Sequence, residues 1–362
     1  MYKKYLLVMA AGVFAASSIA QDSSGAIKSK DSFTGLKTSV ALDVVGEFGE
    51  DSAASNEINV RDAEVMFYAP VDPNFNAFLS FAGFTRAGEA SVELHEAYVT
   101  SPKLIPSTEL KLGRFFLPLG RLGGFHRHEW PFVSTPLVIE EFFGDEGVLD
   151  TGLEVRSLLP LPVYADLRLG MTKGYELGHS HGSEEEEDSS EKPQTPTHYA
   201  KLSFFQDAFT NGGIQESINY IGRLDAAGNR SAHYGLDVTS KWGDGFNPTL
   251  LQAEAWLKKA SEAGEEEGHS SFGLYAFARM PLSRHWSTGL RFDYLKAEEH
   301  DESENLIEEK VFALTPMLQW RASEFSTFRL AGEYKKPEGE DSQFKAQLQW
   351  AVVLGEHPAH DF

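Results

Sequence analysis

The sequence contains no cysteine, which excludes disulfide bonds and attachment of a lipid anchor to a processed cysteine. It also has no apolar run of the roughly 20 residues that a membrane-spanning helix requires. Convincing helical periodicity is almost absent along the chain. A lipoprotein, a disulfide-stapled secreted domain and a helical membrane protein are therefore disfavoured.

The start of the chain has the features of a secretory signal peptide. Lys3 and Lys4 precede an apolar stretch over residues 5–16, and a small-x-small cleavage site ends at Ala20. We expect cleavage after Ala20, with a periplasmic N-terminal segment over residues 21–37. The protein is thus expected to be exported from the cytoplasm.

Apolar and polar residues alternate through most of the remaining sequence, and aromatic residues make up 12% of the chain. Alternation of this kind is typical of half-buried strands. We predict sixteen strands, over residues 38–48, 58–69, 74–86, 91–100, 108–116, 151–157, 163–173, 198–206, 214–222, 232–242, 249–259, 271–280, 285–297, 310–321, 326–334 and 343–355. The predicted fold is an all-β transmembrane antiparallel barrel over residues 38–362.

The connections between these strands alternate in length. Every second connection is short, whereas most of the others are long: residues 117–150, 174–197, 260–270, 298–309 and 335–342. Bacterial outer-membrane barrels place short turns in the periplasm and long loops outside. A soluble β-sandwich also alternates, but the strand number and this asymmetry favour a multi-pass barrel in the outer membrane of a Gram-negative bacterium.

The formal net charge is -22, and most of it lies in four of the long connections. They hold 21 acidic residues against three lysines. The predicted lumen faces are mixed in sign, with these residues: Arg156, Asp166, Arg168, Asp237, Lys241, Arg291 and Asp293. The acidic loops either keep the surface solvated and bind divalent cations that bridge lipopolysaccharide, or form a vestibule that concentrates cations.

One acidic loop carries His179 and His181, and His269 and His300 are expected in the other acidic loops. Imidazole next to carboxylate suits borderline metal ions such as zinc, nickel or copper. The candidate metal ligands are His179, His181, Glu184, Glu185, His269 and His300. The alternative is a hydrophilic loop that binds no metal.

The longest connection, residues 117–150, is too apolar and aromatic to extend into water, so we expect it to fold into the lumen. Such a loop narrows the pore, and its charged residues would select the solutes that pass. The predicted constriction residues are Arg114, Arg121, His126, Arg127, His128 and Glu129. Alternatively, these side chains only fasten the loop to the wall through ion pairs.

Several motifs carry a resemblance to a known family. They are residues 112–121 (LGRFFLPLGR), His126, His128, 130–133 (WPFV), 136–138 (PLV), 142–147 (FFGDEG), 150–152 (DTG) and 354–360 (LGEHPAH). The chain resembles porin-like outer-membrane proteins often labelled zinc-regulated outer-membrane receptors and, more distantly, phosphate-selective porins. The resemblance implies a porin-type barrel linked to zinc supply. The chain is too short for a 22-stranded energy-coupled transporter with a plug, so passive diffusion is the expected mechanism.

The leading hypothesis is a channel for passive diffusion of small hydrophilic solutes or ions, linked to uptake of zinc or other divalent cations. The alternative is a non-conducting surface barrel that binds metal or a partner through its acidic, His-bearing loops. No Gly-x-Ser-x-Gly elbow is present, so we expect no enzymatic activity. No cofactor is expected to be required, although the loops could hold zinc or another divalent cation. The expected partners are the lipid bilayer, lipopolysaccharide, the barrel-assembly machinery through the terminal Phe362 and further copies in a homotrimer, with no nucleic acid.

Overall fold

A computed structural model describes residues 35–49, 57–86, 89–174, 193–264, 268–300 and 306–355. The predicted signal peptide, its cleavage site and Phe362 lie outside these residues. The elements are β1 (Lys37–Gly49), β2 (Glu57–Pro70), β3 (Asn76–Arg86), β4 (Glu89–Ile105), β5 (Thr108–Phe116), η1 (Arg127–Glu129), α2 (Leu137–Phe143), β6 (Leu149–Leu158), β7 (Tyr164–Thr172), β8 (Thr195–Asp207), β9 (Gly212–Leu224), β10 (Arg230–Trp242), β11 (Thr249–Ser261), β12 (His269–Pro281), β13 (Trp286–His300), β14 (Leu306–Ser323), β15 (Ser326–Pro337) and β16 (Gln343–Gly355).

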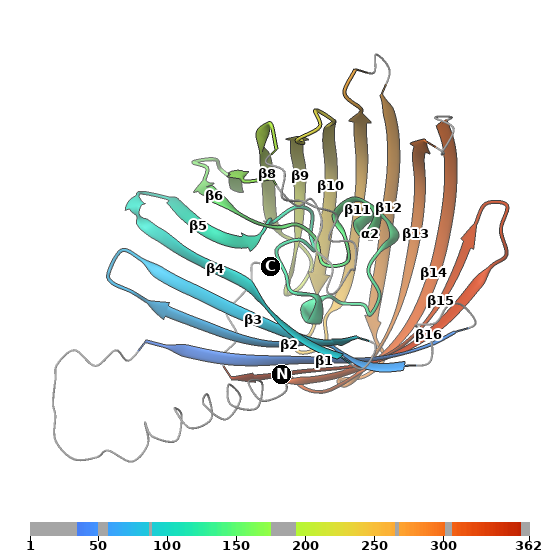
Figure 1. Cartoon of the computed structure of the whole chain (residues 1–362). Helices are drawn as coiled ribbons and strands as arrows, with labels where there is room; N and C mark the ends of the chain where they lie inside the picture. The colour runs from blue at the N-terminus through green and yellow to red at the C-terminus, as the bar shows by residue number, and fades with distance from the viewer. Residues whose placement is uncertain are drawn as a thin grey trace. The chain divides into compact units, whose positions relative to one another are not determined.

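The sixteen strands form one closed antiparallel barrel in which each strand pairs with its neighbours in sequence and β1 pairs with β16 (Figure 1). Closure joins Ser39 to Gly355 at one end of the seam and Gly49 to Lys345 at the other. The predicted fold class and strand number are confirmed. Neither helical element of the described residues is long or apolar enough to cross a membrane.

The strands at one end extend further than predicted. His269 begins β12 and His300 ends β13, so these two candidate metal ligands belong to strands and not to loops. The hairpin pairing continues there, with Ala260 opposite His269 and His300 opposite Leu306. The predicted strands, 271–280 and 285–297, stop short of these two residues because apolar alternation ends where the strands leave the apolar belt, whereas backbone pairing continues.

The outer wall carries two rows of aromatic side chains. In the first, Trp286, Trp320, Phe328 and Trp350 face one another across β13 to β16, with neighbouring ring centroids 6.2, 5.3 and 5.3 Å apart. The second row, nearer the long connections, contains Phe272, Tyr294, Phe312, Tyr334 and Phe344. Exposed leucines such as Leu290, Leu318 and Leu348 lie between the two rows.

The spacing of these rows matches a bilayer. Trp286 and Tyr294 are eight residues apart on β13, as are Phe312 and Trp320 on β14. At about 3.3 Å per residue and a tilt of about 40°, this separation gives a height of roughly 20 Å, close to the apolar band of about 25 Å in membrane barrels. The apolar outer belt with aromatic edges is therefore suited to contact with lipid.

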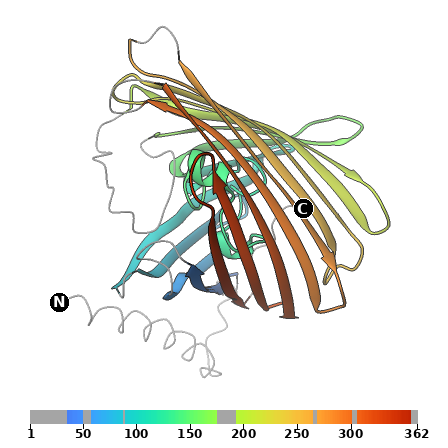
Figure 2. The ribbon, with the colours of Figure 1, turned by 90° about the vertical axis from the view of Figure 1, so that its right-hand side faces the viewer.

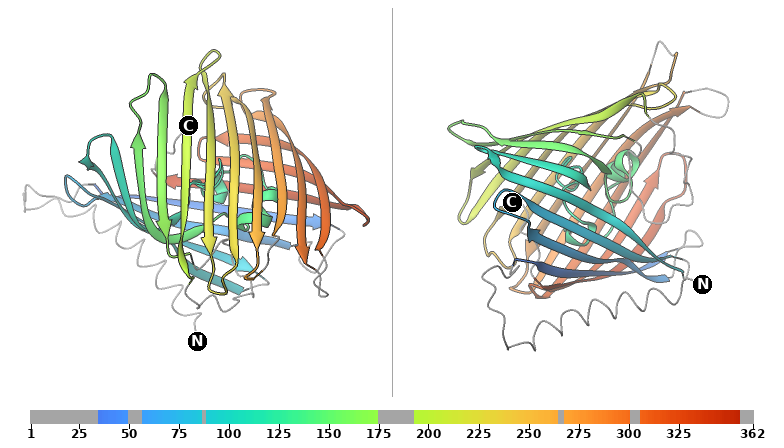
Figure 3. Two further views of the ribbon diagram at one scale, coloured as in Figure 1. Left: turned by 90° about the horizontal axis from the view of Figure 1, so that it is seen from above. Right: turned by 60° about the vertical axis from the view of Figure 1, so that its left-hand side comes forward.

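The connection between β5 and β6 runs inside the ring of strands, and the two views in Figure 3 agree with Figures 1 and 2 in placing α2 there. We call residues 117–148 the inner segment. Its apolar side chains form a core with inward side chains of the wall. The segment contributes Leu117, Leu119, Leu122, Trp130, Phe132, Val133, Leu137, Val138, Ile139, Phe142, Phe143 and Val148 to this core. The expected inward fold of this connection is confirmed.

Candidate functional site: the inner segment and its cavity

The inner segment is fastened first to the strands β8, β9 and β11. The carboxylate of Glu254 accepts hydrogen bonds from the backbone N–H groups of Arg121 and Leu122, at 2.9 and 3.2 Å. Lys201 Nζ donates to the Gly120 carbonyl at 2.5 Å, and the Gly120 N–H donates to the side chain of Asn219. Gly120 has a φ of 62°, and a Cβ there would lie 2.1 Å from Glu254 Oε2, so glycine is required at this anchor.

A second anchor joins the segment to β13 and β15. Arg291 Nε donates to Asp293 at 2.7 Å, while its terminal nitrogens donate to the backbone and hydroxyl oxygens of Ser134. The Ser134 hydroxyl in turn donates to Glu333 at 2.7 Å. Asp293 also accepts from the Leu137 N–H at the start of α2. Arg291 and Asp293, predicted as lumen residues, therefore face inward and hold this segment.

A third anchor lies on β2 and β4, where histidines of the segment meet carboxylates of the wall. His126 Nδ1 lies 3.2 Å from Glu64 Oε2, and His126 Nε2 lies 3.1 Å from Glu96 Oε2. His128 Nδ1 lies 3.5 Å from Asp62 Oδ2. All five side chains are buried.

These contacts control the charge of the two histidines. Burial favours the neutral ring of His126, but the carboxylates of Glu64 and Glu96 outweigh it and raise the pKa of His126 well above its ordinary value. The pKa of His128 is also raised, since the nearby Asp62 outweighs the effect of burial. In this arrangement the carboxylates favour the protonated form of both imidazoles.

Beside the segment lies a cavity of ≈ 900 Å³ between its first half and several strands from β1 to β9. Pro118, Gly120, Arg121, Phe125 and His126 of the segment form one side of this cavity. The charged residues of its lining are Lys37, Glu96, Glu109, Lys111, Arg121, Glu154, Arg156, Asp166, Arg168 and Lys201. The lining combines aromatic and apolar residues with charged ones, and the charges are mixed in sign, with six basic and four acidic side chains.

Two arginines of this lining share one carboxylate. Arg156 and Arg168 are opposite each other on β6 and β7, and their Nε atoms lie 2.5 and 3.1 Å from the two oxygens of Asp166. Asp166 can neutralise only one of them. Two guanidinium groups thus lie around one carboxylate in the cavity lining.

More basic groups lie inside the barrel on β12, β14 and β15. Within the part of the chain that the structure describes, Arg279, Arg321 and Arg329 have no carboxylate within ion-pair distance. Arg329 donates instead to Gln319 and Gln349, and Arg321 to the carbonyl of Phe246. These three arginines add positive charge to the inner faces of β12, β14 and β15, among inward residues of mixed sign.

The predicted constriction residues do not form a single ring. Arg121 and His126 line the cavity, whereas His128 is buried against Asp62 of the wall and Arg127 lies 3.9 Å from Asp145 of the segment itself. Glu129 accepts from the backbone N–H of His126 within the segment. Arg114 is on β5, two residues from the outward-facing Leu112, and is not part of the cavity lining.

The other predicted site residues are distributed as follows. Among the predicted lumen residues, Asp237 lies on the inner face of β10 and accepts a hydrogen bond from the side chain of Asn219 on β9. Lys241 lies near the end of β10. Of the loop metal ligands, His179, His181, Glu184 and Glu185 lie outside the described residues. His269 and His300 stand at strand ends, as described above.

Sequence reasoning missed the partners of the segment histidines: Asp62, Glu64, His95 and Glu96. Asp62 and Glu64 are two residues apart, as same-face residues of a strand are, and His95 follows on β4. Acidic and imidazole side chains at strand positions that face the lumen could have indicated a polar site there. Pairing them with His126 and His128 required knowing where the inner segment lies.

No family model matches the chain. An uncharacterized protein of Aquifex aeolicus is 28% identical over 350 residues, which span 88% of this chain and 73% of that protein. The solved structures that the chain resembles include an anion-selective porin from Comamonas acidovorans, with a TM-score of 0.61 and 10% identity over 88% of this chain and 99% of that one. OprB of Pseudomonas putida gives a TM-score of 0.60 at 9% identity, over 88% of this chain and 94% of that one.

The outer-membrane channel DcaP of Acinetobacter baumannii is similar as well, with a TM-score of 0.55 and 13% identity over 88% of this chain and 96% of that one. At these identities the likeness is one of fold. The chain has a porin-like barrel, the architecture of outer-membrane porins.

Proposed function

We propose that the protein is a porin-like channel in the outer membrane of a Gram-negative bacterium, through which small hydrophilic solutes diffuse passively. The observation that carries this proposal is a closed sixteen-strand barrel whose lumen holds both an inner segment and a charged cavity of ≈ 900 Å³. A barrel of this strand number is wide enough for an aqueous path, which a barrel of about eight strands is not. The segment would set the width of that path.

The charges support a division of roles between the two ends. The acidic residues near the long connections would concentrate cations outside and bind divalent ions shared with lipopolysaccharide, although lysines neutralise some of them. Lys296, for example, lies 3.0 Å from Glu298 and 2.6 Å from Glu308. The inner cavity has more basic than acidic groups. We propose that divalent cations, including zinc, gather at the outer mouth while the inner cavity favours anionic solutes.

Bilayer conductance tests this proposal. The refolded mature chain should give single-channel steps, and the reversal potential in a salt gradient should shift towards cations when Arg156→Gln and Arg168→Gln are combined. Lys310→Gln combined with Lys336→Gln is the matched control, because it removes two positive charges that are not part of the cavity lining. Equal shifts in both double variants would contradict a selective role for the cavity.

A second candidate function is a non-conducting barrel that captures metal or a partner at its surface. It is favoured by the apolar core between the inner segment and the wall, which fills part of the lumen. Absence of conductance in a correctly folded, heat-modifiable preparation would establish this candidate over the first. Assembly into a homotrimer, and recognition of the terminal Phe362 by the barrel-assembly machinery, belong to the proposal in either case.

A further inference from the structure

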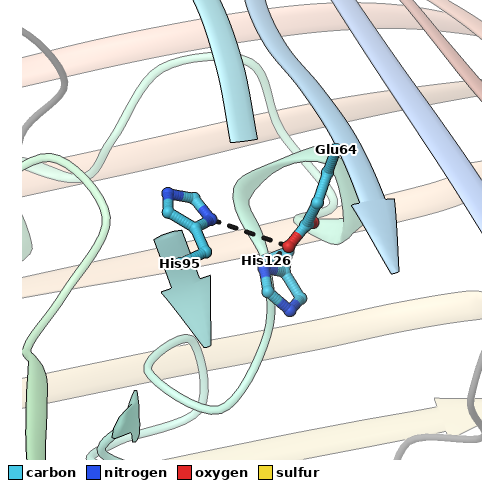
Figure 4. Close-up of side chains that lie close together, drawn as sticks. All are labelled: Glu64, His95 and His126. Carbon is cyan, nitrogen blue, oxygen red and sulfur yellow. Dashed lines mark ion pairs between the residues drawn. The ribbon is translucent and has the colours of Figure 1, made fainter. Parts of the chain in front are cut away.

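Three histidines and two carboxylates converge where the inner segment meets β2 and β4. Asp62 and Glu64 come from β2, His95 from β4, and His126 and His128 from the segment. Figure 4 shows the carboxylate of Glu64 beside the ring of His126 and directed toward the ring of His95. We call these five residues the histidine–carboxylate cluster. They form two overlapping groups, Glu64–His95–His126 and Asp62–Glu64–His128, in each of which one ligand atom per residue lies within 4.8 Å of the others.

The atomic separations fit ligands around an ion better than hydrogen bonds. His95 Nδ1 lies 3.6 Å from Glu64 Oε1, and His126 Nδ1 lies 3.2 Å from Glu64 Oε2. Neither oxygen of Glu64, nor Nδ1 of His126, has a hydrogen-bond partner among the described residues, although both side chains are buried. Ligands held about 2.0–2.1 Å from a tetrahedral metal ion are about 3.3 Å apart, which is close to these distances.

The histidines are also oriented as metal ligands usually are. His126 directs Nδ1 at Glu64, while its Nε2 meets Glu96, which is itself held by the Phe116 N–H at 3.0 Å. His95 follows the same pattern, with its Nε2 3.4 Å from Glu93 and 3.8 Å from Glu146. A second carboxylate on the far nitrogen fixes the tautomer and orientation of a metal-bound imidazole.

The buried carboxylates of the cluster need positive charge beside them, which protonated imidazoles supply when no metal ion is bound. Asp62 and Glu64 are 2% and 0% exposed, and no lysine or arginine nitrogen lies within ion-pair distance of either among the described residues. Buried carboxylates are unfavourable unless they are paired with a cation or bind a metal ion. A divalent ion would supply that charge and would release protons from the imidazoles on binding.

We propose that the histidine–carboxylate cluster binds a divalent transition-metal ion of the zinc type, with Glu64, His95 and His126 as its ligands, and Asp62 and His128 beside them. Mixed imidazole and carboxylate donors suit zinc and similar borderline ions, and not calcium or magnesium. Because its ligands belong to three separate elements, the ion fastens the inner segment to β2 and β4. His126 and Glu96 also line the cavity, which gives the ion a route to the site.

Metal binding by the refolded full-length mature chain tests the proposal. All variants should carry His179→Ser and His181→Ser, so that the outer loop contributes no histidine. After chelation and dialysis against zinc, the parent chain should retain stoichiometric zinc, and Glu64→Gln or His126→Gln should weaken zinc binding by at least about 100-fold. Glu96→Gln leaves the three ligands in place and should weaken zinc binding by about 10-fold.

His233→Gln is the matched control. His233 is another buried lumen histidine, but it packs against Phe142 and Phe143 and is not part of the cluster. Zinc affinity should be unchanged in this variant. Heat-modifiable migration in detergent verifies that every variant folds. Equal zinc binding by the parent chain and His126→Gln, or an equal loss in His233→Gln, would overturn the proposal whether or not the protein conducts.

A nitroxide label tests the fastening of the segment separately. The chain contains no cysteine, so Gly124→Cys supplies a unique attachment point in the segment, where a Cβ meets its nearest atom at 3.7 Å. The electron paramagnetic resonance spectrum should broaden when zinc is added and sharpen when it is chelated. With Glu64→Gln also present, zinc should have no effect. A spectrum insensitive to zinc in a chain that binds zinc would contradict the fastening role.

Discussion

At the scale of single residues, the inner segment depends on a few positions that accept only one kind of side chain. Gly120 is the clearest, because its backbone is left-handed and the carboxylate of Glu254 lies where a Cβ would be. Arg291 is similar: its guanidinium contacts Asp293 and both oxygens of Ser134 at once. Such residues fix the segment although most of its neighbours are apolar.

Gly120→Ala should lower the free energy of unfolding by about 1–3 kcal/mol, because it adds backbone strain and displaces Glu254 from two N–H groups. Urea unfolding in detergent micelles or lipid vesicles measures the change. Gly124→Ala is the control, since its φ is not left-handed and its Cβ would make ordinary contacts. Similar losses in the two variants would mean that the geometry at Gly120 is not responsible.

At the scale of elements, the barrel wall and the inner segment are stabilised in different ways. The strands satisfy one another's backbone groups around a closed ring. The segment has only the seven-residue helix α2 and the short η1, so wall side chains must accept or donate many of its backbone hydrogen bonds. The wall should therefore fold without the segment, whereas the segment should not be ordered without the wall.

Replacing residues 124–145 by a short glycine–serine linker should leave the sixteen strands intact and raise single-channel conductance several-fold, because the obstruction of the lumen is removed. Planar-bilayer recording gives the conductance, and heat-modifiable migration shows whether the barrel forms. Arg291→Gln is a milder change that removes one anchor of the inner segment without deleting the segment. It should increase open-channel noise, because the segment is then held less firmly in the lumen. An unchanged conductance in the linker variant would show that the segment does not limit the path.

At the scale of the whole molecule, the arrangement of apolar residues is opposite to that of a soluble protein. Large side chains such as Leu290, Leu318 and Leu348 are exposed on the outer wall, while Gln347, Gln349 and Asp43 are buried inside. The two aromatic rows limit this apolar belt. This pattern suits a barrel in a bilayer and is costly in water.

Leu290→Arg, between the aromatic rows, should lower the free energy of unfolding from lipid vesicles by about 2–4 kcal/mol, because it places a charge near the bilayer midplane. Leu354→Arg is the control: Leu354 is exposed on the same outward face of β16 as Leu348 and Trp350 but lies beyond the row that contains Trp350, where a charge should cost less than about 1 kcal/mol. Equal costs at the two positions would contradict the proposed position of the membrane.

The sequence by itself determined the barrel. Alternation with a period of two indicates where the strands are and which side chains of each strand face the lumen. Gln347 and Gln349, for example, are buried inside the barrel, as this alternation predicts. The apolar content of the longest connection was also sufficient to predict that it folds inward. These properties are local, because each depends on side chains a few residues apart and on whether those side chains tolerate water.

Only the tertiary structure decided what the inward side chains do. His126 and His128 were expected to line a constriction. The structure places both against Asp62 and Glu64 of β2 and near His95 of β4, and His126 also lines the cavity. Glu64 and His126 are 62 residues apart in sequence. Their contact depends on the curvature of the closed wall, which brings inward side chains together, and on the anchors at Gly120 and Arg291, which determine where the segment crosses the lumen.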